Sequence, residues 1–276
     1  MKTLLFLALA FTLVNCKSEK EEQPAIAEPS PVQVKLETAM GNVVIELSDK
    51  TPLHRDNFIK IVNEGRLDSM LFHRVLEGFV VQAGLYDSLT MAAMDSVELE
   101  AVNYRIPAEM DSTLFHKRGA LGAARTGNPD RESSSLSFYV VHRGPRVDSL
   151  IDVDQDRINT WLQQYYFLQD PSNSSWKDSL NLADQNEDWE TFSRLSDTIN
   201  KLADTFTFEY YDIPEDQREI YRKQGGTPHL DQNYTVFGEV ISGMTVIDSI
   251  AKVAVNEAGM PDQPVYIHRA EVVKSE

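Results

Sequence analysis

An arginine, a phenylalanine and a glutamine stand close together in one short stretch of the chain. Arg74, Phe79 and Gln82 belong to the run Leu71-Phe72-His73-Arg74-Val75-Leu76-Glu77-Gly78-Phe79-Val80-Val81-Gln82-Ala83-Gly84. Side chains two residues apart share a face of an extended chain, and a turn at residues 76–78 would fold Arg74 back beside Phe79. The pattern predicts a hairpin that places a cation over an apolar pocket, a combination that suits proline chemistry.

The residues around this hairpin predict further strands and two helices. Thr51 before Pro52 is typical of a capped helix start, and apolar residues at helical spacing predict a second amphipathic helix at 244–251. Apolar runs or alternating patterns predict strands at 32–38, 42–47, 119–124, 137–141, 234–240 and 265–273. The residues alone therefore indicate a β-rich domain with two helices.

A long, polar and acidic segment at 144–224 interrupts the strand pattern and contains all three tryptophans of the chain. Apolar stripes at 158–168 and 189–202, which include Trp161 and Trp189, predict two helices. We expect both stripes to form buried core. A third short helix is predicted after Pro214, so the segment is interpreted as a helical subdomain inserted between two strands.

Three aspartates in this segment imitate the start of a calcium-binding loop. Asp152, Asp154 and Asp156 have the spacing of its first ligands. Arg157, however, occupies the position where the sharp turn needs glycine, and Gln163 stands where a bidentate glutamate would close the site. We interpret these aspartates as a solvated helix start, and we predict no metal and no cofactor for the chain.

The run from Phe72 to Gly84 resembles the signature F-H-R-V-x-x-G-F-x-x-Q-x-G of the cyclophilin family of peptidyl-prolyl isomerases. Further pieces of the family pattern occur in order at residues 40–47, 57–58, 116–121, 138–141, 227–231 and 234–240. The resemblance implies a mainly β fold, a closed eight-stranded antiparallel barrel capped by two helices. It places this domain at 32–273, interrupted by the insertion, and implies an enzyme that isomerises X-Pro bonds of proline-containing polypeptide segments.

The resemblance also implies roles for individual residues. Arg74, Phe79 and Gln82 would be catalytic, with Arg74 as the donor to the prolyl nitrogen. The substrate-binding residues would be His73, Val80, Ala124, Arg125, Tyr139, His229, Leu230 and Tyr234. The chain departs from the family at three positions. Arg125 stands where the family often has asparagine, and Ser137 stands where it commonly has glutamine. His229 stands where cyclosporin-sensitive members have tryptophan. Residues 85–95 replace a glycine-rich loop.

The first residues have the charge and hydropathy of an export signal. Lys2 precedes an apolar stretch at 4–14 that is too short to span a bilayer. Cys16, the single cysteine, follows directly, and the arrangement resembles a bacterial lipoprotein signal in which residues 1–15 are removed and the cysteine is lipidated. Asn15 departs from the small residue usual before that cysteine. An ordinary secretory signal with an unmodified cysteine is the alternative.

Residues 16–31 are charged and contain proline, which predicts a flexible tether. Glu19, Glu21 and Glu22 resemble the acidic residues that mark some Gram-negative lipoproteins for the cell surface, although a solvated spacer explains them equally well. The chain carries a net charge of −17; without Lys2 the balance is 25 basic against 43 acidic residues, or −18. We therefore expect no nucleic-acid partner, and membrane contact through the lipid alone.

These patterns together predict a monomeric, lipid-anchored isomerase of a bacterial cell envelope, on the periplasmic face or the cell surface. It would assist the folding of envelope or surface proteins. The main alternative is a barrel with weak or no turnover that serves as a binding or chaperone module through its helical insertion. A structural envelope lipoprotein with a vestigial groove is a third possibility.

Overall fold

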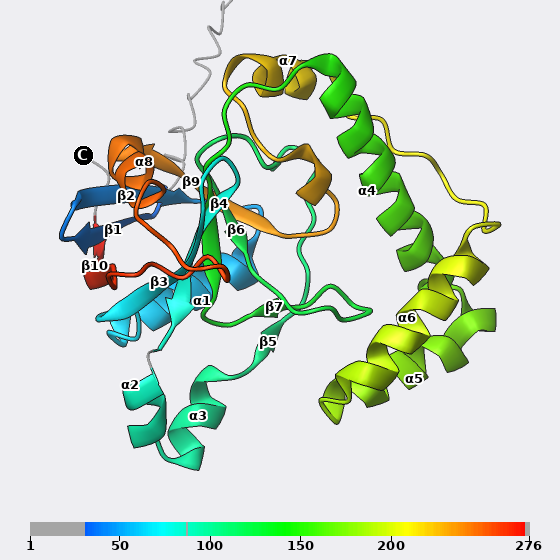
Figure 1. The fold of residues 1–276 in the computed structure, drawn as a ribbon, viewed down its shortest axis with the longest axis horizontal. Helices are drawn as coiled ribbons and strands as arrows, with labels where there is room; N and C mark the ends of the chain where they lie inside the picture. Colours follow the sequence, from blue (N-terminus) through cyan, green and yellow to red (C-terminus); the bar gives the residue numbers. More distant parts are fainter. Residues whose placement is uncertain (1–30, 87, 274–276) are drawn as a thin grey trace, which may run out of the picture. The chain divides into compact units, whose positions relative to one another are not determined.

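The computed structural model describes residues 31–86 and 88–273, and Figure 1 shows how their strands and helices are arranged. Cys16 and the predicted signal and tether lie outside this range, apart from residue 31. Among the helices of the described part, none is long and apolar enough to cross a membrane.

Eight strands pair antiparallel and close into a barrel in the order β1-β10-β3-β4-β8-β6-β9-β2. They are β1 (Gln33–Thr38), β2 (Gly41–Leu47), β3 (Met70–Leu76), β4 (Val80–Leu85), β6 (Ala120–Ala123), β8 (Phe138–Val141), β9 (Val236–Ser242) and β10 (Tyr266–Val273). A separate two-stranded sheet pairs β5 (Arg105–Ile106) with β7 (Ser133–Ser134). The predicted eight-stranded antiparallel barrel is confirmed.

Alternate residues of the strands fill the barrel interior. Val34 of β1 pairs with Ile45 of β2, and both side chains are fully buried, as the alternating pattern predicts. Phe58 of α1 (Pro52–Asn63) packs edge-on against Phe138 and Phe237, at 5.2 and 5.4 Å between ring centroids. Burial of each such side chain contributes roughly 1.5–3 kcal/mol to folding. Helices α1 and α8 (Met244–Ile250) are the two predicted barrel helices.

The start of α1 is capped differently from the prediction. Thr51 occupies the cap position, but its buried hydroxyl has no hydrogen-bond partner among the described residues. The amides of Leu53 and His54 donate instead to the carboxylate of Glu109, at 3.1 and 3.0 Å, and His54 Nδ1 lies 2.7 Å from the same carboxylate. Burial lowers the pKa of His54 although Glu109 opposes this effect. A residue far away in the sequence therefore caps the helix.

Two short helices follow β4 where the family has its glycine-rich loop. They are α2 (Ser88–Ala93) and α3 (Ser96–Val102). The Asp95 carboxylate accepts the amides of Val97 and Glu98, both at 2.9 Å, and the Glu98 carboxylate accepts the amide of Asp95 at 3.1 Å. This reciprocal capping box is a local signal that indicates α3, although the strand pattern of the sequence does not predict either helix.

The predicted helical insertion is confirmed, with one helix more than predicted. It consists of α4 (Asp148–Gln169), the short η1 (Pro171–Asn173), α5 (Ser174–Gln185), α6 (Trp189–Ala203) and α7 (Glu215–Lys223), and η2 (Pro228–Leu230) follows. In Figure 1, α4 runs from the α7 end of the insertion to the paired helices α5 and α6. The unpredicted α5 covers the apolar face of α6 and places Leu180 beside Ile199 in one buried cluster.

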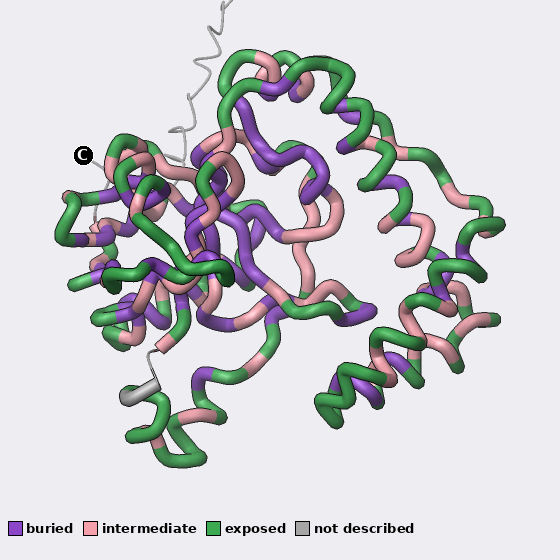
Figure 2. Tube along the Cα trace, in the orientation of Figure 1, coloured by how far each residue is buried: buried purple, intermediate pink, exposed green. Residues whose placement is uncertain are grey.

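The apolar stripes of the insertion are core with three exceptions. Figure 2 shows buried positions spaced along α4 to α7. Trp189 and Leu202 are instead 50% and 42% exposed, and Trp161 packs against the apolar cluster of the barrel that contains Tyr139. The prediction that both stripes are wholly core is therefore wrong at these three residues. A bidentate ion pair between Arg105 of β5 and the buried Asp184 of α5, with Nη2 to Oδ1 at 2.9 Å, also links the insertion to the rest of the domain.

We expect Glu109→Ala to lower the free energy of unfolding by about 1–2 kcal/mol, because it removes the cap of α1 and leaves His54 without its partner. Thr51→Val removes only the unpartnered hydroxyl at nearly constant volume, so it should be neutral or stabilising. Chemical denaturation of the two variants measures the difference. A larger loss in Thr51→Val than in Glu109→Ala would contradict this assignment of the cap.

Candidate active site

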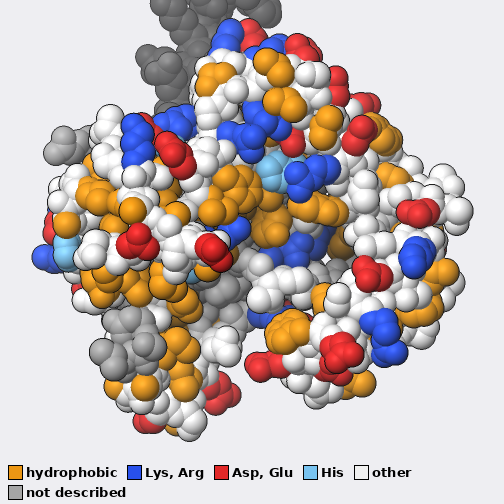
Figure 3. All heavy atoms as spheres, in the orientation of Figure 1, with side chains coloured by type: hydrophobic (Ala, Val, Ile, Leu, Met, Phe, Trp, Pro, Cys, Tyr) orange, Lys and Arg blue, Asp and Glu red, His pale blue; other side chains and the backbone are white. Residues whose placement is uncertain are grey.

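A groove of about 290 Å³ opens on the outside of the barrel, on the side of α4. Figure 3 shows Lys and Arg side chains beside hydrophobic ones in the hollow between the barrel and the insertion. The residues that line the groove are Arg74, Phe79, Val80, Gln82, Ala124, Arg125, Tyr139, Arg157, Trp161, His229, Leu230 and Tyr234. Every predicted catalytic and substrate-binding residue except His73 is among them.

Strand pairing sets the central residues of the groove in one row. Arg74 of β3 pairs with Gln82 of β4. Gln82 pairs in turn with Tyr139 of β8, and Tyr139 with Gly122 of β6. The neighbours of this row along the strands belong to the barrel core; they are Val75, Val81, Val140 and Leu121. Since successive side chains point to opposite faces, the row points outward into the groove.

His73 does not line the groove, because β3 is irregular at this position. Phe72 pairs with Ala83 and Arg74 with Gln82, so β3 contains one extra residue between these pairs. The Nδ1 atom of His73 is buried without a hydrogen-bond partner among the described residues, and burial lowers the pKa of the ring. The bulge thus separates His73 from the residues with which the family pattern groups it.

Hydrogen bonds of Ser137, the residue just before β8, orient Gln82 and, through it, Arg74. The hydroxyl of Ser137 donates to the carbonyl oxygen of Ala83 at 3.3 Å and accepts from Gln82 Nε2 at 3.1 Å. The amide oxygen of Gln82 is thereby turned toward Arg74, whose Nη1 lies 3.5 Å away. Arg74 forms no ion pair with any described residue, so most of its N–H groups are available to a ligand.

Aromatic and apolar side chains form the floor of the groove. The rings of Phe79 and His229 stack, with 5.5 Å between centroids and 14° between planes. Gly122 leaves the space that the Tyr139 ring occupies, since a Cβ on Gly122 would lie 2.3 Å from that ring. The members of this cluster, here called the groove floor, are Phe79, Val80, Tyr139, Leu230 and Tyr234. A small apolar ring fits such a surface better than a charged or extended side chain.

A buried hydrogen-bond network holds Tyr139 from behind. The hydroxyl of Tyr139 lies 2.8 Å from His116 Nε2, and His116 Nδ1 lies 2.8 Å from Asp231 Oδ1. Tyr221 of α7 donates to the other oxygen of Asp231 at 2.5 Å. Burial raises the pKa of Tyr139 and Tyr221, so both stay protonated. Because the Asp231 carboxylate only accepts, Nδ1 of His116 donates to it, and in the neutral tautomer Nε2 accepts from Tyr139.

Helix α4 fixes the segment that contains His229. Asp154 is 3% exposed, so the interpretation of this aspartate as part of a solvated helix start is wrong. Its oxygens lie 2.5 Å from Arg146 Nη2 and 3.3 Å from His229 Nδ1. Burial alone would raise the pKa of Asp154, but His229 and Arg146 together lower it. The carboxylate is therefore an ionised anchor between the insertion and the groove.

Arg125 and the α4 residues complete the groove wall. The guanidinium of Arg125 donates to the carbonyl and side-chain oxygens of Asn233, at 3.1 and 2.6 Å, and lies over the Tyr234 ring. Burial lowers the pKa of Arg125. Arg157 and Trp161 of α4 lie outside the sequence motifs from which the site residues were predicted. Their spacing of four residues is a signal that they share a helix face, but only the packing shows that this face meets the barrel.

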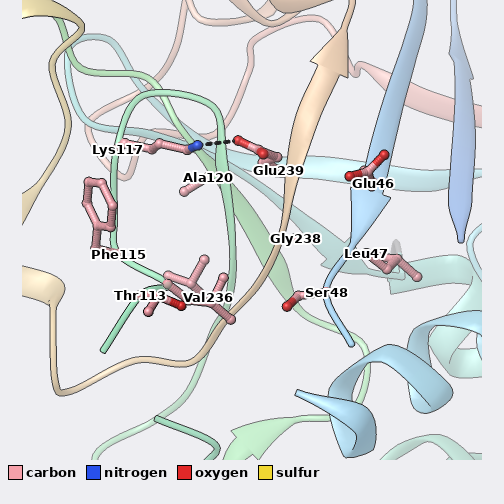
Figure 4. A pocket seen from close by; sticks show the side chains of 11 residues that line it. Glu46, Leu47, Ser48, Thr113, Phe115, Lys117, Ala120, Val236, Gly238 and Glu239 are labelled. Carbon is pink, nitrogen blue, oxygen red and sulfur yellow. Dashed lines mark ion pairs between the residues drawn. The ribbon is translucent and has the colours of Figure 1, made fainter. Parts of the chain in front are cut away.

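A second hollow, of about 170 Å³, lies at β2, β6 and β9, and Figure 4 shows its lining side chains. It shares no residue with the groove. Its lysine, Lys117, pairs with Glu239 at 2.6 Å, so that charge is already compensated. The groove combines an apolar floor with an arginine that has free donors, and we therefore identify the groove as the candidate active site.

Comparisons with known proteins agree with the fold. The model of the family described as cyclophilin type peptidyl-prolyl cis-trans isomerase/CLD matches residues 33–165 and 206–272, leaving out the whole of α5 and α6. Peptidyl-prolyl cis-trans isomerase A of Dickeya dadantii is 25% identical over 256 residues, which are 91% of this chain and 90% of that protein. The peptidyl-prolyl cis-trans isomerase of Acinetobacter baylyi is 25% identical over 244 residues, covering 87% of this chain and 84% of its own length.

A crystal structure of a cyclophilin type peptidyl-prolyl cis-trans isomerase from Cryptosporidium parvum has the same fold. It matches with a TM-score of 0.51 at 13% identity, over 89% of this chain and 99% of its own. The family match extends over both parts of the barrel, on either side of helices α5 and α6. The chain therefore belongs to the cyclophilin family, and it is a peptidyl-prolyl cis-trans isomerase.

Proposed function

We propose that Arg74 is the catalytic donor of this isomerase and that the groove floor receives the proline ring of an extended client segment. The observation that carries this proposal is the pairing of Arg74 with Gln82 and of Gln82 with Tyr139. It sets a guanidinium with free donors beside the apolar floor. A proline bound there would have its nitrogen at the boundary between the floor and the cation.

The chemistry requires a donor at that boundary. Rotation about an X-Pro bond has a barrier of about 18–20 kcal/mol, because the nitrogen lone pair is conjugated with the carbonyl. At the twisted transition state the conjugation is lost, and the lone pair of the pyramidal nitrogen accepts a hydrogen bond that the planar ground state cannot accept. A donor fixed at this atom therefore binds the transition state more tightly than either isomer.

Arginine suits this role physically. Its guanidinium is rigid, stays protonated and offers several donors. The contact of Arg74 with Gln82 at 3.5 Å restricts the orientation of the guanidinium, and exclusion of water by a bound proline would strengthen its electrostatic effect. Gln82 would also bind the client backbone, while Phe79, Val80, Tyr139 and Leu230 contact the ring.

We further propose that the enzyme acts on envelope or surface proteins while anchored to a bacterial membrane through a lipid on Cys16. The support is the order of Lys2, the apolar residues 4–14 and the single cysteine. The charged tether at 16–31 would give the domain the reach that an anchored enzyme needs.

We expect Arg74→Ala to lower kcat about 100-fold, with little change in peptide affinity, because the lost hydrogen bond forms mainly in the transition state. Arg74→Lys keeps the charge but loses the fork of donors, so its kcat should lie between those of the parent and Arg74→Ala. NMR exchange measurements on a short Ala-Pro peptide give both quantities, with Arg269→Ala, an exposed arginine outside the groove, as the matched control. Equal turnover by Arg74→Ala and the parent would contradict the assignment, whereas turnover by neither would favour the binding-module alternative.

Asp231→Ala should lower the free energy of unfolding by about 3 kcal/mol, because His116 and Tyr221 lose their shared buried acceptor. Since Tyr139 then loses its support, we expect KM for an Ala-Pro peptide to rise more than kcat falls. Denaturation and steady-state assays of the folded fraction test both effects, with the exposed Glu257→Ala as control. Unchanged stability and KM would show that this network does not hold the groove floor.

The mature amino terminus is expected to be Cys16 bearing two acyl chains on its thiol-linked glycerol. Mass spectrometry of protein extracted from the membrane fraction of expressing cells identifies that species. Cys16→Ser should then move the protein to the aqueous fraction. Cleavage at another residue, or an unmodified cysteine in a membrane-free protein, would refute the anchor.

A further inference from the structure

The groove concentrates positive charge in a strongly acidic chain. Arg74 of β3, Arg125 after β6 and Arg157 of α4 line it, and none of its lining residues within the described part is Asp or Glu. The whole chain carries −17. Long-range attraction therefore does not favour an acidic client, and any preference for one has to arise locally, from the groove itself.

The three arginines differ in how many hydrogen bonds their guanidinium groups already form within the protein. Arg125 is bound to Asn233 and lies over Tyr234, and Arg74 is the proposed donor to the prolyl nitrogen. Arg157 is exposed, and its guanidinium makes neither an ion pair nor a hydrogen bond with any described residue. The guanidinium carbon lies 5.8 Å from the centroid of the Trp161 ring.

Helix α4 holds Arg157 at the groove between two anchors. Asp154, Arg157 and Trp161 are three and four residues apart, so they lie on one face of the helix. Asp154 is anchored one turn earlier, beside Arg146 and His229. Trp161 is anchored one turn later, edge-on against Tyr234 with 6.5 Å between centroids. The position of Arg157 at the rim is therefore set by a buried ion pair on one side and by a partly buried aromatic contact on the other.

We infer that Arg157 is a specificity residue that favours proline segments with a carboxylate, from Asp or Glu, within two residues of the proline. The inference rests on the groove assignment proposed above. A planar guanidinium binds a carboxylate through two parallel hydrogen bonds, and Arg157 is the groove arginine whose donors are all unused among the described residues. Because the site is partly open to solvent, we expect the carboxylate to contribute as much as one exposed ion pair. It should raise kcat/KM about threefold over a segment without a carboxylate.

The test uses pairs of peptides of equal length with a central Ala-Pro. The two members of a pair differ only in having Glu or Gln at one position, and the pairs place that position one or two residues before or after the Ala-Pro. The parent is expected to turn over the Glu peptide about threefold faster, by kcat/KM at low salt, at one or more of these positions. Arg157→Gln should reduce that ratio to about one, and so should 0.5 M salt, which screens exposed charges. Arg194→Gln is the matched control, because Arg194 is an exposed arginine on α6 that does not line the groove.

The two variants change the net charge of the chain equally, so a difference between them reports the position of the charge. A Glu/Gln ratio that is unchanged in Arg157→Gln, or lowered equally in both variants, would overturn the inference. In that case loss of turnover in Arg74→Ala would still support the groove as the active site. Absence of turnover of every peptide by the parent would overturn the groove assignment and this inference together.

Discussion

The pairing register of β3, β4, β8 and β6 is the constraint on which the groove depends. It puts Arg74, Gln82, Tyr139 and Gly122 in one row across four strands. A shift of one residue in any of these strands would exchange the outward row with the core residues beside it. The alternation that buries one set of side chains in the barrel core therefore also points Arg74, Gln82 and Tyr139 into the groove. The stability of the barrel and the geometry of the groove depend on the same register.

The register also explains why small residues matter at two places. Gly122 leaves room for the Tyr139 ring. Gly84 adopts a positive φ of 97°, and a Cβ there would lie 2.1 Å from the carbonyl oxygen of Leu136. Close approach of the 136–137 segment to β4 brings Ser137 to Gln82. Ser137 replaces a longer family residue, yet it takes part in the hydrogen bonds that orient Gln82 and Arg74.

One part of the insertion borders the groove, and another part lies away from it. Tyr221 of α7 donates to the Asp231 carboxylate behind the groove floor, and Asp154 of α4 lies 3.3 Å from His229 at its edge. Both contacts are buried, so the insertion is packed against the residues that support the groove. Helices α5 and α6 instead form a separate core at the far end of α4, and both helices lie outside the residues that the family model matches.

The sequence by itself determined the family, the barrel and most of the groove. Short-range alternation identified the strands, and the spacing from Arg74 to Gln82 identified the hairpin, because both follow from local backbone geometry. The family pattern then indicated Tyr139, His229 and Leu230, which the structure brings to the same groove.

Only the tertiary structure decided how distant segments meet. Glu109 rather than Thr51 caps α1, Asp154 is buried rather than solvated, and His73 is displaced by a bulge. Trp161 has the spacing of a core residue but lines the groove with Arg157. Helical periodicity predicts that a face is buried without telling against which partner, since that depends on packing between segments far apart in the chain.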